Sequence, residues 1–250
     1  MPVRDAATVV LLRDGADGLE AWLLTRVRQM AFAAGMTVFP GGRVDEADVH
    51  LPLEVADVER VAARFDCDAP SARAVLGAAA RETFEETGVL LTRPAAVLPD
   101  DRAAVESGAL SFGDLLARHQ LTVDGAALRP WARWVTPEGE VRRYDTRFFV
   151  GTLPDGASAA DVTTESSAAG WLPIGVALEQ VQAGERRMLP PTMITMTELL
   201  AHSTVAEVLV AADERVIRPV RPTLRIAEDG AVTVELDDGS VHPVPRAMLA

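Results

Sequence analysis

Lysine is absent from this sequence, because each of its 24 basic residues is an arginine. This excludes a Schiff base on the chain and a P-loop lysine on a phosphate. Cysteine occurs once, as Cys67, which excludes an internal disulfide and agrees with a reducing compartment. No apolar run reaches the ~18 residues of a membrane span, and the first residues lack the pattern of a secretory signal. We therefore expect a soluble, cytoplasmic protein.

Positive charge is scarce relative to negative charge, and the net charge is −13. Such a surface disfavours nucleic acid as a partner, since phosphate contacts need clustered positive charge. A small anionic substrate is still compatible if metal ions and a few arginines reverse the local field. The length of 250 residues and the 48% hydrophobic content predict a folded chain with a sizeable core.

The hydrophobic pattern predicts strands and helices that alternate along the chain. Apolar and β-branched runs predict strands at 6–12, 19–25, 89–91, 131–135 and 146–153. Helices are expected at 55–65, 71–87, 176–183 and 192–202, with a helical insert at 100–121. A short extended segment at 35–42 ends in Pro-Gly-Gly. After about residue 203 the pattern indicates a small β-meander.

Three glutamates lie together near the end of the predicted helix 71–87. Glu82, Glu85 and Glu86 are spaced i, i+3 and i+4, so they share one helix face and repel one another. Arg81 offsets only part of this repulsion. A hard divalent cation such as Mg²⁺ or Mn²⁺, which prefers oxygen ligands, would offset it more fully. A solvated acidic face is the alternative for this pattern taken alone.

The segment around these acids resembles the Nudix box. In that family a glycine is followed after five residues by an acid, and after seven more by Arg-Glu-apolar-x-Glu-Glu-x-Gly-apolar. Gly42, Asp48 and the run from Arg81 to Val89 match this pattern, with Thr83 where an apolar residue is usual. The resemblance implies an α/β/α sandwich with a mixed sheet, plus helical insertions and a small C-terminal β-rich extension.

The spacing inside the box departs from the family pattern. Asp48 and Arg81 are separated by 32 residues, 49–80, which is 25 more than usual. A long insertion here is a feature of the Nudix subgroup that includes the peroxisomal coenzyme A diphosphatase. We therefore predict a Nudix domain over 1–202 with an insertion at 49–80, and an extension over 203–250 packed on it.

The resemblance also implies the chemistry, namely Mg²⁺- or Mn²⁺-assisted hydrolysis of a phosphoanhydride in a nucleoside diphosphate linked to another moiety. One of the glutamates, or a carboxylate from another loop, would act as general base, and Arg81 would orient the glutamates. The implied metal ligands are Glu82, Glu85 and Glu86, the Gly41 carbonyl and, with a surface role as the alternative, Glu165. The expected partner is a small-molecule diphosphate, and neither nucleic acid nor a membrane is expected as a partner. Whether the chain forms a homodimer is left undecided by the sequence.

The substrate is less well specified. Coenzyme A-cleaving relatives carry two arginines in a segment that Leu23 to Gly42 resembles, but here Arg26 and Arg28 are out of that register. Either could still contact a phosphate, and Arg147 could face the substrate or pair with Asp145 or Glu165. Coenzyme A or its acyl derivatives come first; nucleotide sugars, dinucleotides and a non-catalytic nucleotide-binding module are the alternatives. We expect the insertion, Arg26 and Arg28 to decide among them.

Overall fold

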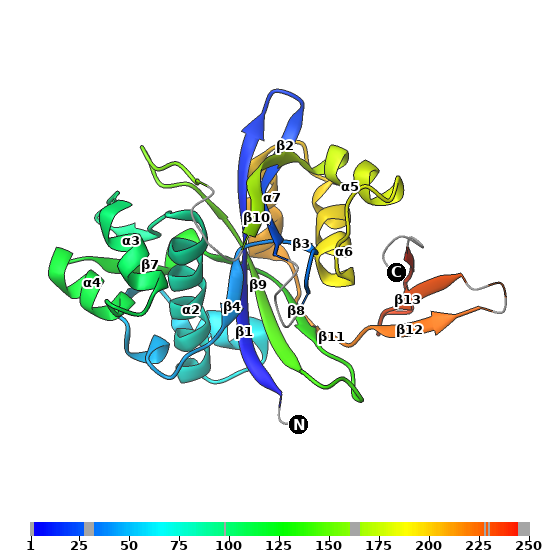
Figure 1. Ribbon diagram of the computed structural model, residues 1–250. Coiled ribbons are helices and arrows are strands. Elements are labelled where there is room, and N and C mark those ends of the chain that lie inside the picture. The colour runs from blue at the N-terminus through cyan, green and yellow to red at the C-terminus, as the bar shows by residue number, and fades with distance from the viewer. Residues whose placement is uncertain are drawn as a thin grey trace.

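A mixed β-sheet between two layers of helices forms the body of the molecule in the computed structural model (Figure 1). The structure describes residues 3–27, 33–97, 99–160, 166–227, 229 and 231–244. Strands follow the order β10-β2-β1-β9-β8-β11, with β3 beside β2 and β4 beside β1. Their bounds are β1 Arg4–Gly15, β2 Gly18–Arg26, β3 Thr37–Val38, β4 Gly41–Arg43, β8 Arg129–Val135, β9 Tyr144–Thr152, β10 Ser166–Pro173 and β11 Pro219–Val220.

The directions of these strands make the sheet mixed, as predicted. β1 runs parallel to β9, whereas β1 and β2 form an antiparallel hairpin and β8 pairs antiparallel with β9. The hairpin turns at Gly18, whose φ of 111° is a conformation that glycine adopts without strain. The predicted strand–turn–strand at the start of the chain is therefore confirmed.

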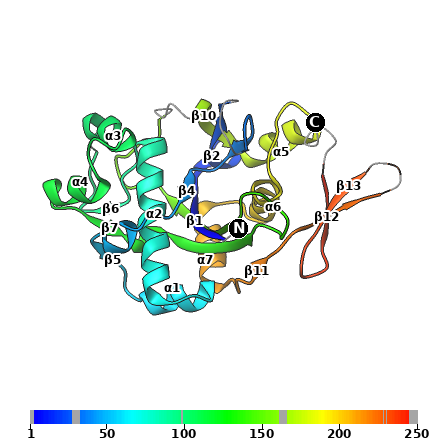
Figure 2. The ribbon, with the colours of Figure 1, turned by 60° about the horizontal axis from the view of Figure 1, so that its bottom comes forward.

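Alternate residues of β1 bury against opposite helical layers. Val9 and Leu11 pack with α1 (Val58–Phe65) and α2 (Ala69–Thr87). Val10 and Leu12 belong to the core under α5 (Ile174–Gln182), α6 (Pro190–Leu199) and α7 (Val205–Glu214). Because side chains alternate along a strand, a continuous apolar run serves both faces. Figure 2 shows α2 and α6 on opposite sides of the sheet, so the predicted α/β/α sandwich is confirmed.

A smaller unit packs on the outer side of α2. It contains α3 (Pro99–Glu106), α4 (Phe112–His119) and the short strands β5 (Leu53–Glu54), β6 (Thr92–Arg93) and β7 (Thr122–Asp124), with the turns η1 (Asp48–His50) and η2 (Gly125–Ala127). The helical insert predicted at 100–121 is confirmed as two short helices. The strand predicted at 89–91 is wrong, because the strand here, β6, begins only at Thr92. Residues 89–91 are apolar because they bury into two adjacent cores.

The predicted insertion 49–80 turns out to be mostly helical. It contains α1 and the N-terminal two thirds of α2, which continues without a break into the glutamate segment. Gly77 allows the close approach of η1 to α2, since a Cβ there would overlap the carbonyl oxygen of Asp48. The insertion therefore lengthens the helix that carries the acids. Asp48, which precedes the insertion, contacts this helix at Gly77 and Arg81.

The C-terminal part begins with a helix that the sequence pattern did not indicate. Val208 and Ala212 of α7 are buried in the core, and the Arg64 side chain of α1 donates to the carbonyls of Ala212 and Arg215. The β-meander expected beyond it is present as β12 (Thr223–Ile226), β13 (Val232–Glu235) and β14 (Val241–Val244), which lie beyond α6 in Figure 1. Across the described residues, no helix combines the length and apolar character needed to cross a membrane.

Candidate active site

The last two turns of α2 carry the three glutamates. Asp68 begins the helix by accepting a hydrogen bond from the Ser71 backbone N–H, and Gly88 ends it with a φ of 74°. No basic residue lies in the last turn, so the carboxylates add to the negative end of the helix dipole. The helix therefore carries its acids where its own electrostatics disfavour them most.

Arg81 connects these acids to the preceding loop. Its Nε and Nη2 donate to the two carboxylate oxygens of Asp48 at 2.9 and 3.0 Å, and Nη2 also donates to the Arg43 carbonyl at 2.9 Å. Its Nη1 donates to Glu82 at 2.9 Å and to Glu85 at 3.4 Å. A single guanidinium thus fixes two of the glutamates relative to Asp48, although 32 residues separate Asp48 from Arg81 in sequence.

The Pro-Gly-Gly segment lies directly against the glutamates. The Gly41 backbone N–H donates to Glu86 Oε2 at 2.8 Å. A Cβ on Gly42 would overlap the Glu82 carboxylate, and a Cβ on Gly41 would overlap the Ala7 carbonyl. Because β4 pairs with β1 and also contacts α2, both glycines are needed for the close approach.

Burial and charge shift the acid–base equilibria of this group. Burial raises the pKa of Glu82 to about 7, against the lowering effect of Arg81, and the Glu85 charge adds to the rise. Burial likewise raises the pKa of Glu85. Burial lowers the pKa of Arg81, but its hydrogen bonds to Asp48 and the nearby carboxylates outweigh this and raise it above its ordinary value. The local positive charge does not offset the cost of the buried acids.

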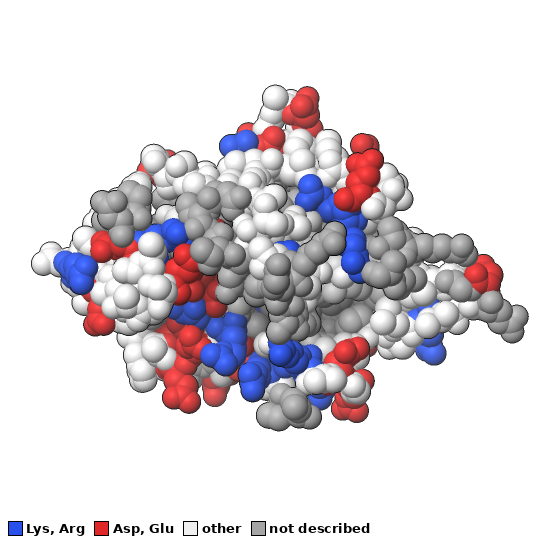
Figure 3. Space-filling model, viewed as in Figure 1, with Lys and Arg blue, Asp and Glu red and all other residues white. Residues whose placement is uncertain are grey.

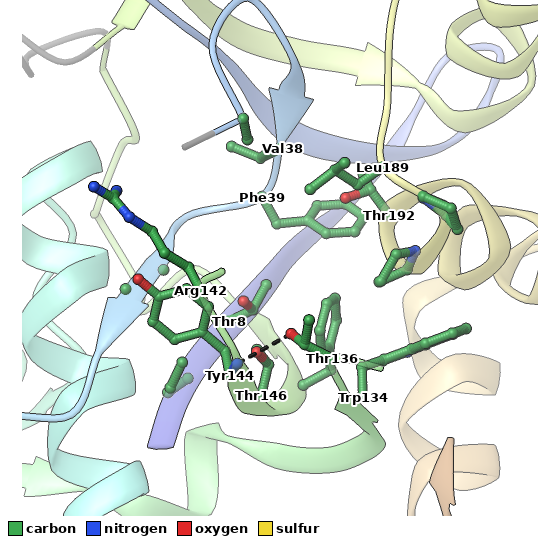
Figure 4. A pocket seen from close by; sticks show the side chains of 18 of the residues that line it. Thr8, Val38, Phe39, Trp134, Thr136, Arg142, Tyr144, Thr146, Leu189 and Thr192 are labelled. Carbon is green, nitrogen blue, oxygen red and sulfur yellow. Dashed lines mark hydrogen bonds between the residues drawn. The ribbon is translucent and has the colours of Figure 1, made fainter. Parts of the chain in front are cut away.

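A cavity of about 680 Å³ lies beside the three glutamates, which form part of its wall. At one end it is lined by the three glutamates, by Arg43 and by Arg142, and the charged residues Arg26 and Glu140 also line it. At the other end its lining is mainly apolar: Phe39, Trp134, Phe148, Leu189, Pro190, Pro191, Leu224 and Val234. Figure 4 shows the Arg142 side chain extending toward α2, away from Leu189 and Trp134. The cavity is therefore charged at one end and apolar at the other.

Charged side chains gather in groups on the outer surface. Figure 3 shows acidic and arginine side chains side by side over α2 and the lower end of β1, with a further charged group near α5 and α6. The acidic net charge of the chain thus coexists with a local cluster of arginines beside the glutamates.

The predicted substrate contacts fall in different places. Arg26 lines the cavity. Arg28 and Glu165 lie outside the residues that the structure describes. Arg147 is buried and lies outside the cavity, where it bonds to Asp5 and, at 2.9 Å, to the Asp145 carbonyl. Arg147 therefore pairs with Asp145, which was one of the two roles expected for it, and it does not face the cavity.

Other lining residues were not predicted from the sequence. Arg43 follows the Gly-Gly pair directly, and that position was the only available signal for it. Arg142 lies two residues before β9, and Tyr144 is its first residue, whose backbone N–H donates to Thr136 Oγ1 at 3.0 Å (Figure 4). Nothing in the local sequence distinguishes Arg142 from its neighbour Arg143, which donates to the Thr136 carbonyl instead.

The donor set suits a hard divalent cation. Within the described ranges, His, Cys, Asp and Glu side chains form no group of three already arranged to hold a metal ion. The glutamates instead contact Arg81 and the Gly41 N–H. They nevertheless supply three carboxylates to one cavity wall, and burial raises the pKa of Glu82 and Glu85. Oxygen donors whose charge is costly in the absence of a cation fit Mg²⁺ or Mn²⁺.

Comparisons with known proteins identify the family to which the chain is similar. A family model described as the NUDT19 Nudix domain matches residues 54–199. The acyl-coenzyme A diphosphatase NUDT19 of Gallus gallus is 25% identical, over 97% of this chain and 78% of its own length. Its Xenopus laevis counterpart is 23% identical, over 90% and 70%. A Caenorhabditis elegans nudix hydrolase is 26% identical over 71% of this chain, and the match spans only about half of that relative, 54%.

A solved structure extends the similarity to three dimensions. The crystal structure of a NUDIX hydrolase from Alicyclobacillus acidocaldarius superposes with a TM-score of 0.70 and is 29% identical. The similarity covers 85% of this chain and 96% of that one. The similarity of fold therefore extends over most of the length of both chains.

Proposed function

The chain belongs to the family described as the NUDT19 Nudix domain, and from this premise we propose that it is a metal-dependent pyrophosphohydrolase. The bond cleaved is a phosphoanhydride in a nucleoside diphosphate linked to another moiety. Coenzyme A or an acyl-coenzyme A comes first as substrate, because two relatives are named acyl-coenzyme A diphosphatase.

The observation that carries the proposal is the pairing of acids and arginines at one end of a single cavity. A diphosphate needs positive charge on its oxygens; Arg43 and Arg142 line the cavity beside the glutamates, and Arg26 also lines it. The glutamates alone would repel such a substrate. A cation between the acids and the diphosphate resolves this conflict, and it is the arrangement that the composition of the wall supports.

The glutamates Glu82, Glu85 and Glu86 would hold the cation, and the Gly41 carbonyl is proposed as a further ligand. When bound, a divalent ion supplies positive charge to the diphosphate oxygens and lowers the pKa of water. Arg81 orients Glu82 and Glu85 through its Nη1. The Gly41 N–H orients Glu86. One of these glutamates, or a carboxylate from another loop, would accept the proton of the attacking water.

A substrate panel tests the proposal. Wild type is assayed with Mg²⁺ and with Mn²⁺ on coenzyme A, acyl-coenzyme A, a nucleotide sugar and a dinucleotide, by release of products with phosphate ends. We expect cleavage of at least one member, and a loss on the order of 10²-fold or more in kcat for Glu85→Gln. In thermal unfolding experiments, an increasing Mg²⁺ concentration should raise the Tm of wild type more than that of the variant.

The matched control is Glu106→Gln. Glu106 of α3 pairs with Arg102 at i, i+4 as Glu85 pairs with Arg81, and the two carboxylate side chains are 20% and 21% exposed. Glu106 does not line the cavity. This variant should keep wild-type activity and the Mg²⁺-dependent rise in Tm. A panel in which nothing is cleaved, or an equally active Glu85→Gln, contradicts the proposed function.

A further inference from the structure

The C-terminal sheet and the residue before it line the apolar end of the cavity. Pro222, Leu224 and Val234 line it together with Leu189 and Trp134 of the main body. By contrast, no residue of the insertion 49–80, all of which the structure describes, lines the cavity. The expectation that the insertion contacts and selects the substrate is therefore not supported, and the chain segment beyond residue 217 takes its place as a candidate.

The two faces of this small sheet differ in chemistry. Residues paired across β12, β13 and β14 point to the same side, so Leu224 shares a face with Val234, and Ile226 shares it with Val232. Val232 and Val234 are buried in the same core as α6. The opposite face carries polar side chains, including the Arg225–Glu235 ion pair at 2.9 Å. The apolar face is thus the one turned toward the cavity.

This face is only partly covered by the rest of the chain. Leu224 is 58% exposed although it lines the cavity, and Ile226, two residues further along β12, is 77% exposed. Leu224 and Ile226 form an apolar strip that begins at the cavity and continues along β12, whereas Val234, which is paired with Leu224, is fully buried. An exposed apolar strip that is continuous with a ligand cavity is typical of a ligand-binding surface.

We propose that this strip, defined by Leu224 and Ile226, binds the hydrocarbon chain of an acylated diphosphate substrate. The inference rests on the proposed function, because the diphosphate must lie at the glutamate end for its far end to reach the strip. An uncharged chain suits the strip, since its lining residues carry no charge. Leu224 is the specificity-determining residue, as it joins the cavity to the exposed part of β12.

The test compares Leu224→Gln with a matched variant on the other face. Val241 of β14 is 59% exposed, is paired with Glu235 and does not line the cavity. Val241→Gln therefore makes a similar polar change in the same sheet without touching the strip. For wild type and both variants, kcat/KM is measured on coenzyme A and on its acetyl, butanoyl and octanoyl derivatives. Affinity for the same ligands is measured by calorimetry with Ca²⁺ in place of Mg²⁺, because a divalent cation is needed to offset the charge of the glutamates.

For wild type, we expect affinity and kcat/KM to rise with chain length, by up to roughly fourfold for each methylene that is buried. Leu224→Gln should flatten this rise and leave coenzyme A itself unaffected, whereas Val241→Gln should behave as wild type. A wild type without chain-length dependence, or a Leu224→Gln variant that retains it, overturns the inference. Chain-length-dependent binding without hydrolysis of any ligand would uphold it and contradict only the proposed function.

Discussion

Asp48 should be worth much more to this protein than its neighbour Asp45, although both carboxylates face Arg81. Asp48 is 2% exposed and accepts two hydrogen bonds from Arg81 and one from the Asp45 backbone N–H at 2.8 Å. The Asp45 side chain is 48% exposed, with its nearest oxygen 3.8 Å from Arg81. In Asp48→Asn the shape is kept, but an amide group replaces one acceptor and the buried Arg81 loses its main counter-charge.

Removing one partner of a buried ion pair costs about 3–5 kcal/mol. Arg81 keeps Glu82, Glu85 and the Arg43 carbonyl, so for Asp48→Asn we expect the lower part of this range, about 3 kcal/mol of unfolding free energy. Asp45→Asn breaks an exposed pair and should cost less than about 1 kcal/mol. Urea unfolding of wild type and both variants, followed by circular dichroism, measures the two differences.

A second readout separates positioning from bulk stability. Because Arg81 orients two of the glutamates, Asp48→Asn should lower kcat by about 10- to 100-fold at a temperature where the variant is fully folded. Asp45→Asn should leave kcat within a factor of two or so. If the two variants lose equal free energy and equal activity, Asp48 does not hold Arg81 in the manner described, and the reasoning from burial is refuted.

Two further predictions concern glycine and arginine positions of the cavity. Gly42→Ala should lower kcat by about tenfold or more, because the added Cβ displaces the Glu82 carboxylate; unchanged kcat in a folded variant would contradict this. Arg142→Ala should raise KM by about tenfold with little change in Tm, whereas Arg147→Ala should lower the unfolding free energy by about 2–3 kcal/mol without raising KM. Steady-state kinetics and thermal melts of both arginine variants test this. A lowered Tm for Arg142→Ala with unchanged KM, or a raised KM for Arg147→Ala, would contradict it.

The features that could be predicted from the sequence depend on short-range patterns. The helix over the glutamates has local signals at both ends, Asp68 with Pro70 at its start and Gly88 at its end. The shared face of the three acids follows from helical spacing alone. The β1–β2 hairpin likewise follows from two apolar runs around a Gly-rich turn.

The features that were missed depend on tertiary context. Val89 to Leu91 looks like a strand, but its residues are apolar because cores lie on both sides of them. On β9, Thr146 and Phe148 line the cavity, so Arg147 between them must point to the other face. A shift of one residue in register would exchange these roles, and the register is set by pairing with β1, which the sequence does not reveal.

The insertion lies within the motif in sequence but does not line the cavity, whereas the distant C-terminal extension does. The insertion interrupts the motif in sequence, yet most of it is helical and it includes the first part of α2. The Asp48–Arg81 hydrogen bonds bring the two halves of the motif together in space. The insertion can therefore vary in length without changing the acid wall, provided that η1 returns to Gly77. The extension is distant from the motif in sequence, but its sheet contributes Leu224 and Val234 to the cavity. Since the catalytic end and the apolar end are built from separate segments, substitutions in β12 should alter substrate preference while leaving the chemistry at the glutamates intact.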